Sequence, residues 1–312
     1  MIFCAGLGTR LRPLTELLPK PACPVLDRPL VWYDLALLAG AGVAEVAVNT
    51  HQLPERMAEA AREGARLLGL GLEISREPEL LGTGGGLRRV APFLRGGTFF
   101  LLNGDILFDV DLEAALRAHR AAGAAATMVV RPMPRDAGYR PVHVRPDGRV
   151  ARIAGEGPPP SGTSPWLFTG VHVLEPEILS LLPDGPSGLH EQGYGPLLGA
   201  GRPVIAHEDR GFWDDLGTPR RYLDANLAAA SGELPLRRFG ALGLDGARRE
   251  KGSWVGVGAR VEGRIERSVV GRAARVPAGA SAIRSLLWPE TELSPGEALE
   301  GAIAAPGLRV PA

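Results

Sequence analysis

An α/β fold followed by a β-helix is predicted by three features of this 312-residue sequence. Strand-like and helix-like segments alternate over residues 2–130, a glycine-rich loop directly follows the first apolar segment, and apolar residues recur at roughly every sixth position after residue 253. The first two features predict a Rossmann-like, mixed and mainly parallel sheet flanked by helices. The third predicts a degenerate left-handed parallel β-helix at the C-terminal end.

The alternation begins with an apolar strand at residues 2–4. The segment 29–41 has apolar residues at helical spacing, and its proline stands at the permitted first position of a helix. The rest of this half is predicted as strands at 44–48, 72–75, 98–102 and 125–130, with helices at 54–68 and, capped by Asp111, up to residue 122. Ligands of such sheets collect beyond the carboxyl ends of the strands, so a site is expected in the loops there.

The pattern changes after residue 141. Short strands separated by Gly and Pro predict an irregular, substrate-side subdomain at 142–173. Sheet character returns at 203–207, and a helix at 219–230 with Thr218 as its N-cap closes the unit. The predicted domains are residues 1–231 and 253–312, joined by a Gly- and Arg-rich linker at 232–252.

The predicted β-helix depends on a loose repeat. Each coil of such a domain buries one apolar residue per short strand, and small residues at the corners permit the turns. The positions that fit are Val255, Val261, Val270, Val276, Leu293 and Leu299. A flexible Gly/Ala tail is the alternative. A β-helix here would support a homo-oligomer rather than supply chemistry.

Composition excludes several classes of protein. With 35 Lys plus Arg and 35 Asp plus Glu, the formal net charge is zero, which removes the broad basic field of a nucleic-acid binder. Cys4 and Cys23 are too few for a disulfide framework and form no metal-binding pair, so a reducing cytoplasm is expected. No apolar run approaches the roughly 20 residues of a membrane span, and no export signal is visible. The very short first strand suggests a native start upstream of Met1.

The glycine loop has the composition of a polyphosphate-binding site. Two glycines let backbone amides approach an anion, and three cations follow that could neutralise it. These residues are Gly6, Gly8, Arg10, Arg12 and Lys20. Lysine occurs elsewhere only at Lys251, so its use at position 20, where a compact ammonium can approach a phosphate, stands out. A tight turn between strand and helix with solvated arginines is the alternative.

Two commoner glycine loops do not fit this segment. A dinucleotide fingerprint needs a third glycine where Leu11 stands, and a Walker loop needs Gly-Lys followed by Ser or Thr. Together with Pro-Lys-Pro at 19–21, the loop instead resembles the signature of the sugar-1-phosphate nucleotidylyltransferases. Members of that family join a nucleotide to a sugar 1-phosphate and release pyrophosphate.

The resemblance implies a nucleotide site. The segment 80–86 resembles the family's Leu-Gly-Thr-Ala-Gly element, whose backbone reads the nucleobase. The implied nucleotide-binding residues are Gly6, Leu7, Gly8, Thr9, Arg10, Glu77, Gly82 and Thr83. Arg10 would stabilise the β- and γ-phosphates, and Lys20 the transferring phosphate.

Two aspartates are predicted to hold a metal ion. Nucleotidyl transfer brings two anions together, and Mg²⁺ prefers one or two carboxylates together with phosphate oxygens and water. Asp105 follows an apolar strand in Asn-Gly-Asp, with Asp109 and Asp111 as local rivals. The segment 213–219 resembles the family's Trp-x-Asp-x-Gly-Thr-Pro element, which favours Asp215 over Asp214. The predicted metal ligands are Asp105 and Asp215, and the predicted catalytic residues are Arg10, Lys20 and Asp105.

The sugar side departs from the family pattern. Where many members have Glu-Lys-Pro, with a lysine on the sugar phosphate, this chain has Glu-Gly-Pro at 156–158, and Arg152 is a candidate for the missing charge. Gly-Tyr-Arg at 138–140 replaces the common Gly-Tyr-Gly. The sugar-binding residues that the resemblance implies are Gly138, Glu156, Thr169 and Gly170.

The sequence thus predicts a Mg²⁺-dependent transferase acting on a nucleoside triphosphate and a sugar 1-phosphate. The resemblance favours the branch with mannose-1-phosphate and heptose-1-phosphate guanylyltransferases and N-acetylmuramate-1-phosphate uridylyltransferases. Two alternatives stay open: a non-catalytic, nucleotide-sugar-binding regulatory homologue, and a cytidylyltransferase acting on a phosphocholine-like alcohol. Neither nucleic acid nor membrane is an expected partner.

Overall fold

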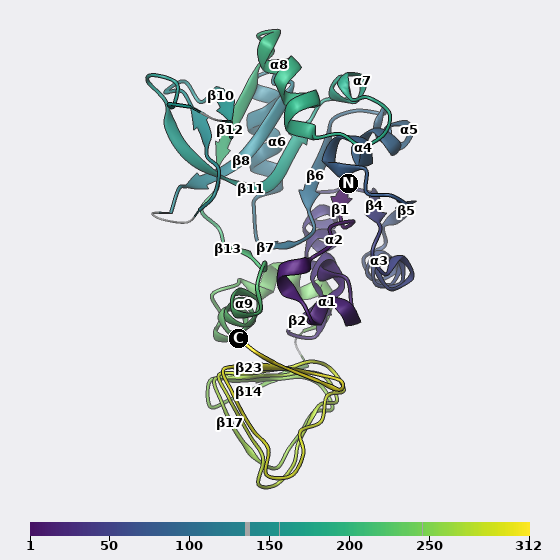
Figure 1. The fold of residues 1–312 in the computed structure, drawn as a ribbon, viewed down its shortest axis with the longest axis vertical. Coiled ribbons are helices and arrows are strands. Elements are labelled where there is room, and N and C mark those ends of the chain that lie inside the picture. The colour runs from purple at the N-terminus through teal and green to yellow at the C-terminus, as the bar shows by residue number, and fades with distance from the viewer. Residues whose placement is uncertain (135–137, 156, 245) are drawn as a thin grey trace.

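The computed structural model describes residues 1–134, 138–155, 157–244 and 246–312. It consists of a helix-flanked sheet and, beyond helix α9 (Pro219–Ser231), a coil of triangular cross-section (Figure 1). The N-terminus lies in the middle of the sheet, and the C-terminus lies beside α9. This confirms the predicted fold class, an α/β sheet followed by a β-helix-like C-terminal part.

The central sheet is mixed and mainly parallel. Its strands are β1 (Ile2–Phe3), β4 (Glu45–Thr50), β5 (Gly71–Arg76), β6 (Phe99–Asn103), β8 (Ala126–Pro132), β9 (Val142–Val144), β10 (Val150–Ile153), β11 (Ser164–Leu174) and β12 (Val204–Glu208). β1 runs parallel to both β4 and β6, β4 to β5, and β8 to β12, whereas β11 is antiparallel to β6 and β8. The carboxyl ends of β1, β4 and β6 therefore meet at one edge.

Both faces of the sheet are buried, which explains the near-continuous apolar strands. Leu101 of β6 belongs to one hydrophobic core, and its neighbour Leu102 belongs to the other. In a strand, successive side chains point to opposite faces, so each face receives one of the pair. The helices that cover these faces are α2 (Leu30–Gly40), α3 (Pro54–Leu68), α4 (Gly82–Arg89), α5 (Ala91–Leu94), α6 (Leu112–Ala121), α7 (Ile178–Leu181) and α8 (Gly195–Gly199).

Two predicted helix caps are confirmed. The Asp111 carboxylate accepts a hydrogen bond from the Ala114 N–H at the start of α6, and the Thr218 hydroxyl accepts one from the Arg221 N–H at the start of α9. Each cap satisfies a donor that has no partner within its own helix. This part also contains several short helices: α1 (Leu14–Leu17), the 3-10 helices η1 (Thr9–Leu11), η2 (Lys20–Ala22) and η4 (Leu236–Leu242), and the π-helix η3 (His190–Tyr194). Two small antiparallel strand pairs complete it: β2 (Pro24–Val25) with β3 (Arg28–Pro29), and β7 (Ile106–Phe108) with β13 (Trp213–Asp215).

The predicted irregularity of residues 142–173 is wrong for β11. This strand has eleven residues and lies between β6 and β8 within the central sheet, while β9 and β10 form a hairpin on its edge. Its pairing with β8 is interrupted between Phe168 and His172, at a bulge that contains Gly170 with φ +93°. Pro165 and Gly170 made the segment resemble a loop. Pro165 lies just past the end of the pairing with β8, where a missing N–H is tolerated, and Gly170 is accommodated by the bulge.

The C-terminal coil is built from parallel ladders. One sheet contains β15 (Ser253–Val255), β18 (Val269–Val270), β21 (Leu286–Leu287) and β23 (Ala302–Ala305), flanked by β14 (Arg248–Glu250) and β24 (Leu308–Pro311). A second contains β17 (Arg264–Glu266), β20 (Ser281–Ile283) and β22 (Ala298–Glu300), and a third contains β16 (Arg260–Val261) and β19 (Arg275–Val276). Five of the six predicted apolar positions are buried, and Val261 is partly buried. The alternative of a flexible tail is therefore wrong.

A serine ladder stabilises successive coils from inside. The Ser253 hydroxyl accepts a hydrogen bond from the Ser268 N–H, and the Ser268 hydroxyl accepts one from the Ser285 N–H. The Ser268 hydroxyl also donates to the Ala282 carbonyl oxygen, and the Ser285 hydroxyl donates to that of Leu299. Because these groups are buried, each hydrogen bond avoids the cost of an unsatisfied polar atom.

The sheet part and the coil share one hydrophobic core. Tyr222 of α9 belongs to the same buried cluster as Trp254, Leu286 and Ile303 of the coil. Asp27, in the turn between β2 and β3, accepts a hydrogen bond from the Arg272 N–H of the coil. Burial raises the pKa of Asp27 to about 6, against the lowering effects of this hydrogen bond and of nearby arginines.

We expect Asp27 to make stability depend on pH. The pKa of Asp27 is 3.8 in the unfolded chain and about 6 in the folded one, so folding favours the protonated carboxyl. The stability that Asp27 contributes is therefore fully present below pH 3.8 and is lost as the pH rises through 6. Asp27→Asn keeps the acceptor oxygen without the charge. The variant should be more stable than the wild type at pH 7.5 by about 2–3 kcal/mol, with the gap narrowing towards pH 4. Urea unfolding at both pH values measures this, and a pH-independent gap would contradict it.

Candidate active site

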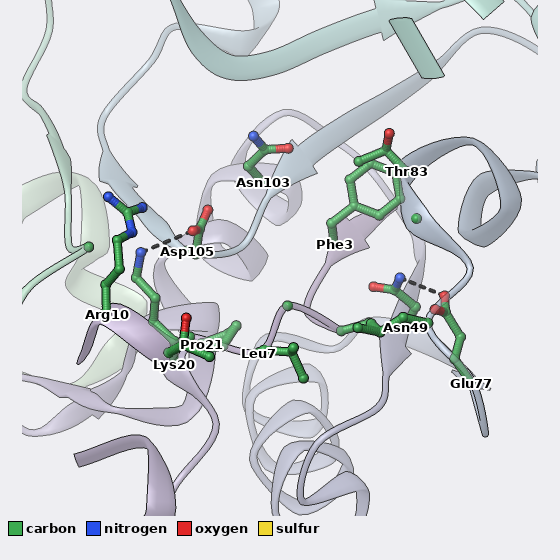
Figure 2. A pocket seen from close by; sticks show the side chains of 17 residues that line it. Phe3, Leu7, Arg10, Lys20, Pro21, Asn49, Glu77, Thr83, Asn103 and Asp105 are labelled. Carbon is green, nitrogen blue, oxygen red and sulfur yellow. Dashed lines mark hydrogen bonds and ion pairs between the residues drawn. The ribbon is translucent and has the colours of Figure 1, made fainter. Parts of the chain in front are cut away.

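A cavity of about 500 Å³ opens at the carboxyl edge of β1, β4 and β6. Figure 2 shows Arg10, Lys20 and Asp105 at one end of it and Asn49 and Glu77 at the other. All eight predicted nucleotide-binding residues line it: Gly6, Leu7, Gly8, Thr9, Arg10, Glu77, Gly82 and Thr83. Lys20 and Asp105 line it too, so the structure gathers segments that are far apart in the sequence.

Gly8 of the glycine loop lies in close contact with Thr15 and Lys20 at the edge of the cavity. Gly8 has φ +58°, and a Cβ there would lie 3.0 Å from Thr15 Cγ2 and 3.3 Å from Lys20 Cβ. The Thr15 hydroxyl donates to the Gly8 carbonyl oxygen, which holds the turn. Leu7 is 43% exposed, a large apolar side chain at the cavity rather than in the core. Arg12 is exposed and does not line the cavity.

Lys20 joins the two predicted metal-binding aspartates. Its Nζ lies 3.0 Å from Asp105 Oδ2 and 3.3 Å from Asp215 Oδ1, and its side chain is only 5% exposed. The Asp215 side chain is 12% exposed and that of Asp105 is 45% exposed. Two carboxylates thus converge on one cation at the edge of the cavity.

The pairing of β7 with β13 brings these acids together. In this antiparallel pair, Asp215 lies opposite Ile106, the residue after Asp105. Gly104, just before Asp105, allows the chain after β6 to turn close to β1. A Cβ at Gly104 would lie 2.8 Å from Ile2 Cγ2 and 2.9 Å from Cys4 Sγ. The rivals Asp109 and Asp111 do not line the cavity, and Asp111 is the cap of α6.

Two arginines, Arg10 and Arg221, lie near Asp215. A Cβ on Gly217 would lie 3.1 Å from both terminal nitrogens of Arg10 and 3.0 Å from Asp215 Oδ1, so Arg10 and this oxygen both border Gly217. The other oxygen, Oδ2, is 3.7 Å from an Arg221 nitrogen and accepts a hydrogen bond of 3.4 Å from the Tyr139 hydroxyl. With Lys20 at Oδ1 and Arg221 near Oδ2, each oxygen of Asp215 has a cation beside it.

Glu77 organises the end of the cavity that lies away from Lys20 and Asp105. Its Oε1 accepts a hydrogen bond from the Asn49 amide at 2.8 Å, and its Oε2 accepts one from the Leu81 N–H at 3.1 Å. Asn49 in turn accepts one from the Cys4 N–H at 2.7 Å. Glu77 thus links the ends of β1 and β4 to α4. Asn49 was expected at this edge because it follows the strand predicted at 44–48, but the sequence assigned it no role.

The glycines of α4 serve packing as well as the cavity. A Cβ at Gly85 would lie 2.2 Å from the Gly185 carbonyl oxygen, and one at Gly84 would lie 2.7 Å from Ser187 Oγ. The Thr83 hydroxyl accepts a hydrogen bond from the Leu189 N–H. Close contact with residues 185–188 therefore explains Gly82, Gly84 and Gly85, and contact with Glu77 and Asn49 explains Gly86.

The predicted sugar residues are only partly described. Glu156 lies outside the described residues. The Thr169 hydroxyl donates to the Val129 carbonyl oxygen inside the sheet, and a Cβ at Gly170 would lie 2.7 Å from Ile106 Cδ1. Gly138 has φ +65°, in the loop that leads to Tyr139. A second cavity of about 490 Å³ lies on this side and is lined by residues including Tyr139, Arg140, Gly155, Phe168 and Glu191.

Arg152, the candidate for the missing charge, contacts its own loop. Its guanidinium donates to the carbonyl oxygens of Pro158 at 3.0 Å and Gly157 at 3.4 Å, and lies 3.3 Å from His143 Nε2. These contacts give Arg152 a role in shaping the loop.

The sequence was compared with models of known protein families. The model of the nucleotidyl transferase family matches residues 1–232. The chain belongs to this family. This member is 31% identical over 248 residues to the UTP--glucose-1-phosphate uridylyltransferase of Synechocystis sp., in an alignment that covers 75% of this chain and 64% of that protein. The chain thus spans slightly less than two thirds of that relative.

Two further comparisons extend this picture. The nucleotidyl transferase family member is 31% identical over 320 residues to the mannose-1-phosphate guanylyltransferase of Mycobacterium tuberculosis, covering 100% of this chain and 81% of that protein. Its fold is similar to the crystal structure of HddC from Yersinia pseudotuberculosis, with a TM-score of 0.61 and 19% identity over 72% of this chain and 96% of that one. Among the described residues, no helix has the length and apolar character needed to cross a membrane.

Proposed function

We propose that the protein transfers a nucleotidyl group from a nucleoside triphosphate to a sugar 1-phosphate, producing a nucleotide sugar and pyrophosphate. The observation that carries the proposal is the convergence of Asp105 and Asp215 on Lys20, beside the glycine loop. Family membership and the names of the relatives support the same reaction class. They do not favour a regulatory homologue or a phosphocholine-type cytidylyltransferase.

The proposed roles follow from charge and position. Arg10 offsets charge on the β- and γ-phosphates as pyrophosphate leaves, and the Lys20 ammonium stabilises the transferring phosphate. The glycine loop presents backbone amides to the phosphates, and Leu7 packs against the base or ribose. Glu77, held by Asn49, positions the α4 backbone at the base edge.

Asp105 and Asp215 fit a divalent metal ion, for which we propose Mg²⁺. Their oxygens already share one cation, and a donor set of two carboxylates completed by phosphate oxygens and water is what Mg²⁺ prefers. Among the described residues, no three His, Cys, Asp or Glu side chains gather as a metal site, so the proposed ion would depend on these two carboxylates together with substrate oxygens and water. The ion would supply charge neutralisation at the transferring phosphate.

The substrates and the domain roles are part of the proposal. We assign catalysis to residues 1–231 and support of assembly to residues 253–312, with 138–170 on the sugar side. A pyrophosphate-release screen that combines GTP, UTP, dTTP and CTP with the 1-phosphates of mannose, glucose, N-acetylmuramate and heptose tests it. One pair should give turnover that requires Mg²⁺. Nucleotide-sugar binding without pyrophosphate release from any pair would overturn it.

A further inference from the structure

Arg221 is a cation beside Asp215 that no motif in the sequence indicated. It lines neither cavity, but it contacts Tyr139, which lines the cavity of about 490 Å³. Arg221, in the first turn of α9, donates to Asp214 Oδ1 at 2.9 Å and to the Tyr139 hydroxyl, and it lies 3.7 Å from Asp215 Oδ2. Its side chain is 38% exposed. Although burial alone would lower its pKa, the hydrogen bond to Tyr139 and the charges of Asp214 and Asp215 raise it, so Arg221 is always charged.

Aromatic rings hold this guanidinium in place. It lies 5.8 Å from the Tyr139 ring centroid and 6.0 Å from that of Trp213, and these two rings meet edge to face. Two of the five N–H donors of an arginine are used by Asp214 and Tyr139, which leaves donors for another ligand. The planar fork of arginine suits a tetrahedral oxyanion.

In-line transfer determines which substrate could meet Arg221. The nucleophile and the leaving pyrophosphate must lie on opposite sides of the transferring phosphorus. Lys20 lies at Asp215 Oδ1, and Arg10 borders Gly217 next to that oxygen, whereas Tyr139 and Arg221 lie at Oδ2. A sugar phosphate that approaches away from the leaving group therefore meets Arg221.

Other cations on this side are less suitable. Arg152 contacts the carbonyl oxygens of its own loop. Arg140 lines the sugar-side cavity but is exposed and, within the described part of the chain, forms no ion pair with either acid. Position 157, where the family resemblance places a lysine, is glycine.

We propose that Arg221, positioned by Tyr139, binds the phosphate of the sugar 1-phosphate and replaces the lysine absent at position 157. The inference rests on the proposed transferase activity. Arg221, the second arginine of the Arg-Arg pair that follows Thr-Pro in this chain, is then a substrate-binding residue.

The test compares Arg221→Gln with Arg220→Gln. Arg220 is the neighbouring arginine, exposed and paired with Asp224, so it is a matched control. With the substrate pair that turns over fastest in the screen, Arg221→Gln should raise KM for the sugar 1-phosphate about 10- to 100-fold, as expected for a lost charged hydrogen bond. KM for the triphosphate should change less than about twofold, and Arg220→Gln should match the wild type.

The reverse reaction provides a readout that a purely structural role would not reproduce. Arg221→Gln should raise KM for the nucleotide sugar, which retains the sugar phosphate, but not KM for pyrophosphate. Arg221→Lys should recover much of the affinity, and Tyr139→Phe should give a smaller loss in the same direction. Thermal unfolding checks that each variant is folded, with Arg221→Lys serving if Arg221→Gln is not.

Three outcomes would overturn the inference. One is an unchanged KM for the sugar 1-phosphate in Arg221→Gln. Another is an equal rise for both substrates. The third is that Arg140→Gln, rather than Arg221→Gln, shows the selective loss. An inactive wild type would instead refute the proposed function, and the inference with it.

Discussion

Asp105→Asn is expected to abolish pyrophosphate release while leaving the protein folded. The variant keeps the size of the side chain but removes one of the two carboxylate charges that face Lys20, and with it a charged ligand of the proposed metal ion. A lost metal-binding carboxylate removes several kcal/mol of transition-state stabilisation, so kcat should fall by about a thousandfold or more. Because the Asp105 side chain is 45% exposed, stability should change by about 1 kcal/mol or less. Steady-state kinetics and thermal unfolding measure the two effects.

Asp111→Asn is the matched control for this variant. Asp111 lies six residues downstream and caps α6, a role that asparagine performs as well. This control should retain near-normal turnover and stability. Near-normal pyrophosphate release from Asp105→Asn would remove Asp105 from the mechanism.

Lys20→Met should have opposite effects on turnover and on metal binding. The ammonium balances Asp105 and Asp215 in the free protein, so its removal leaves two carboxylates facing each other. Binding of a divalent ion without nucleotide should then tighten by about tenfold or more, since a like charge has gone from the site. Turnover should fall by about a hundredfold or more, because the transferring phosphate loses a cation. Free Mn²⁺ measured by electron paramagnetic resonance reports the first effect, and pyrophosphate release the second.

Lys251→Met is the control, because the only other lysine is exposed in the C-terminal coil. It should alter neither quantity. Weaker Mn²⁺ binding in Lys20→Met would show that Lys20 organises the acids instead of competing for them.

The local patterns of the chain were sufficient for much of the fold. Apolar spacing predicted α3 with its observed bounds, and the side chains of Asp111 and Thr218 predicted two helix starts. Helix periodicity and capping act within a few residues, so the sequence records them directly. β11 was missed because its Pro and Gly are tolerated only through its partners, β6, β8 and β9.

The sequence by itself determined the glycine loop with its nearby lysine and the motif around Asp215, since both are read within short stretches of chain. Tertiary structure alone decided that Lys20 meets Asp215 across 195 positions and that Arg221 meets Tyr139 across 82. The physical reason is strand pairing. The antiparallel contact of β7 with β13 places Asp215 opposite Ile106, and no local spacing encodes which distant strand a segment will join.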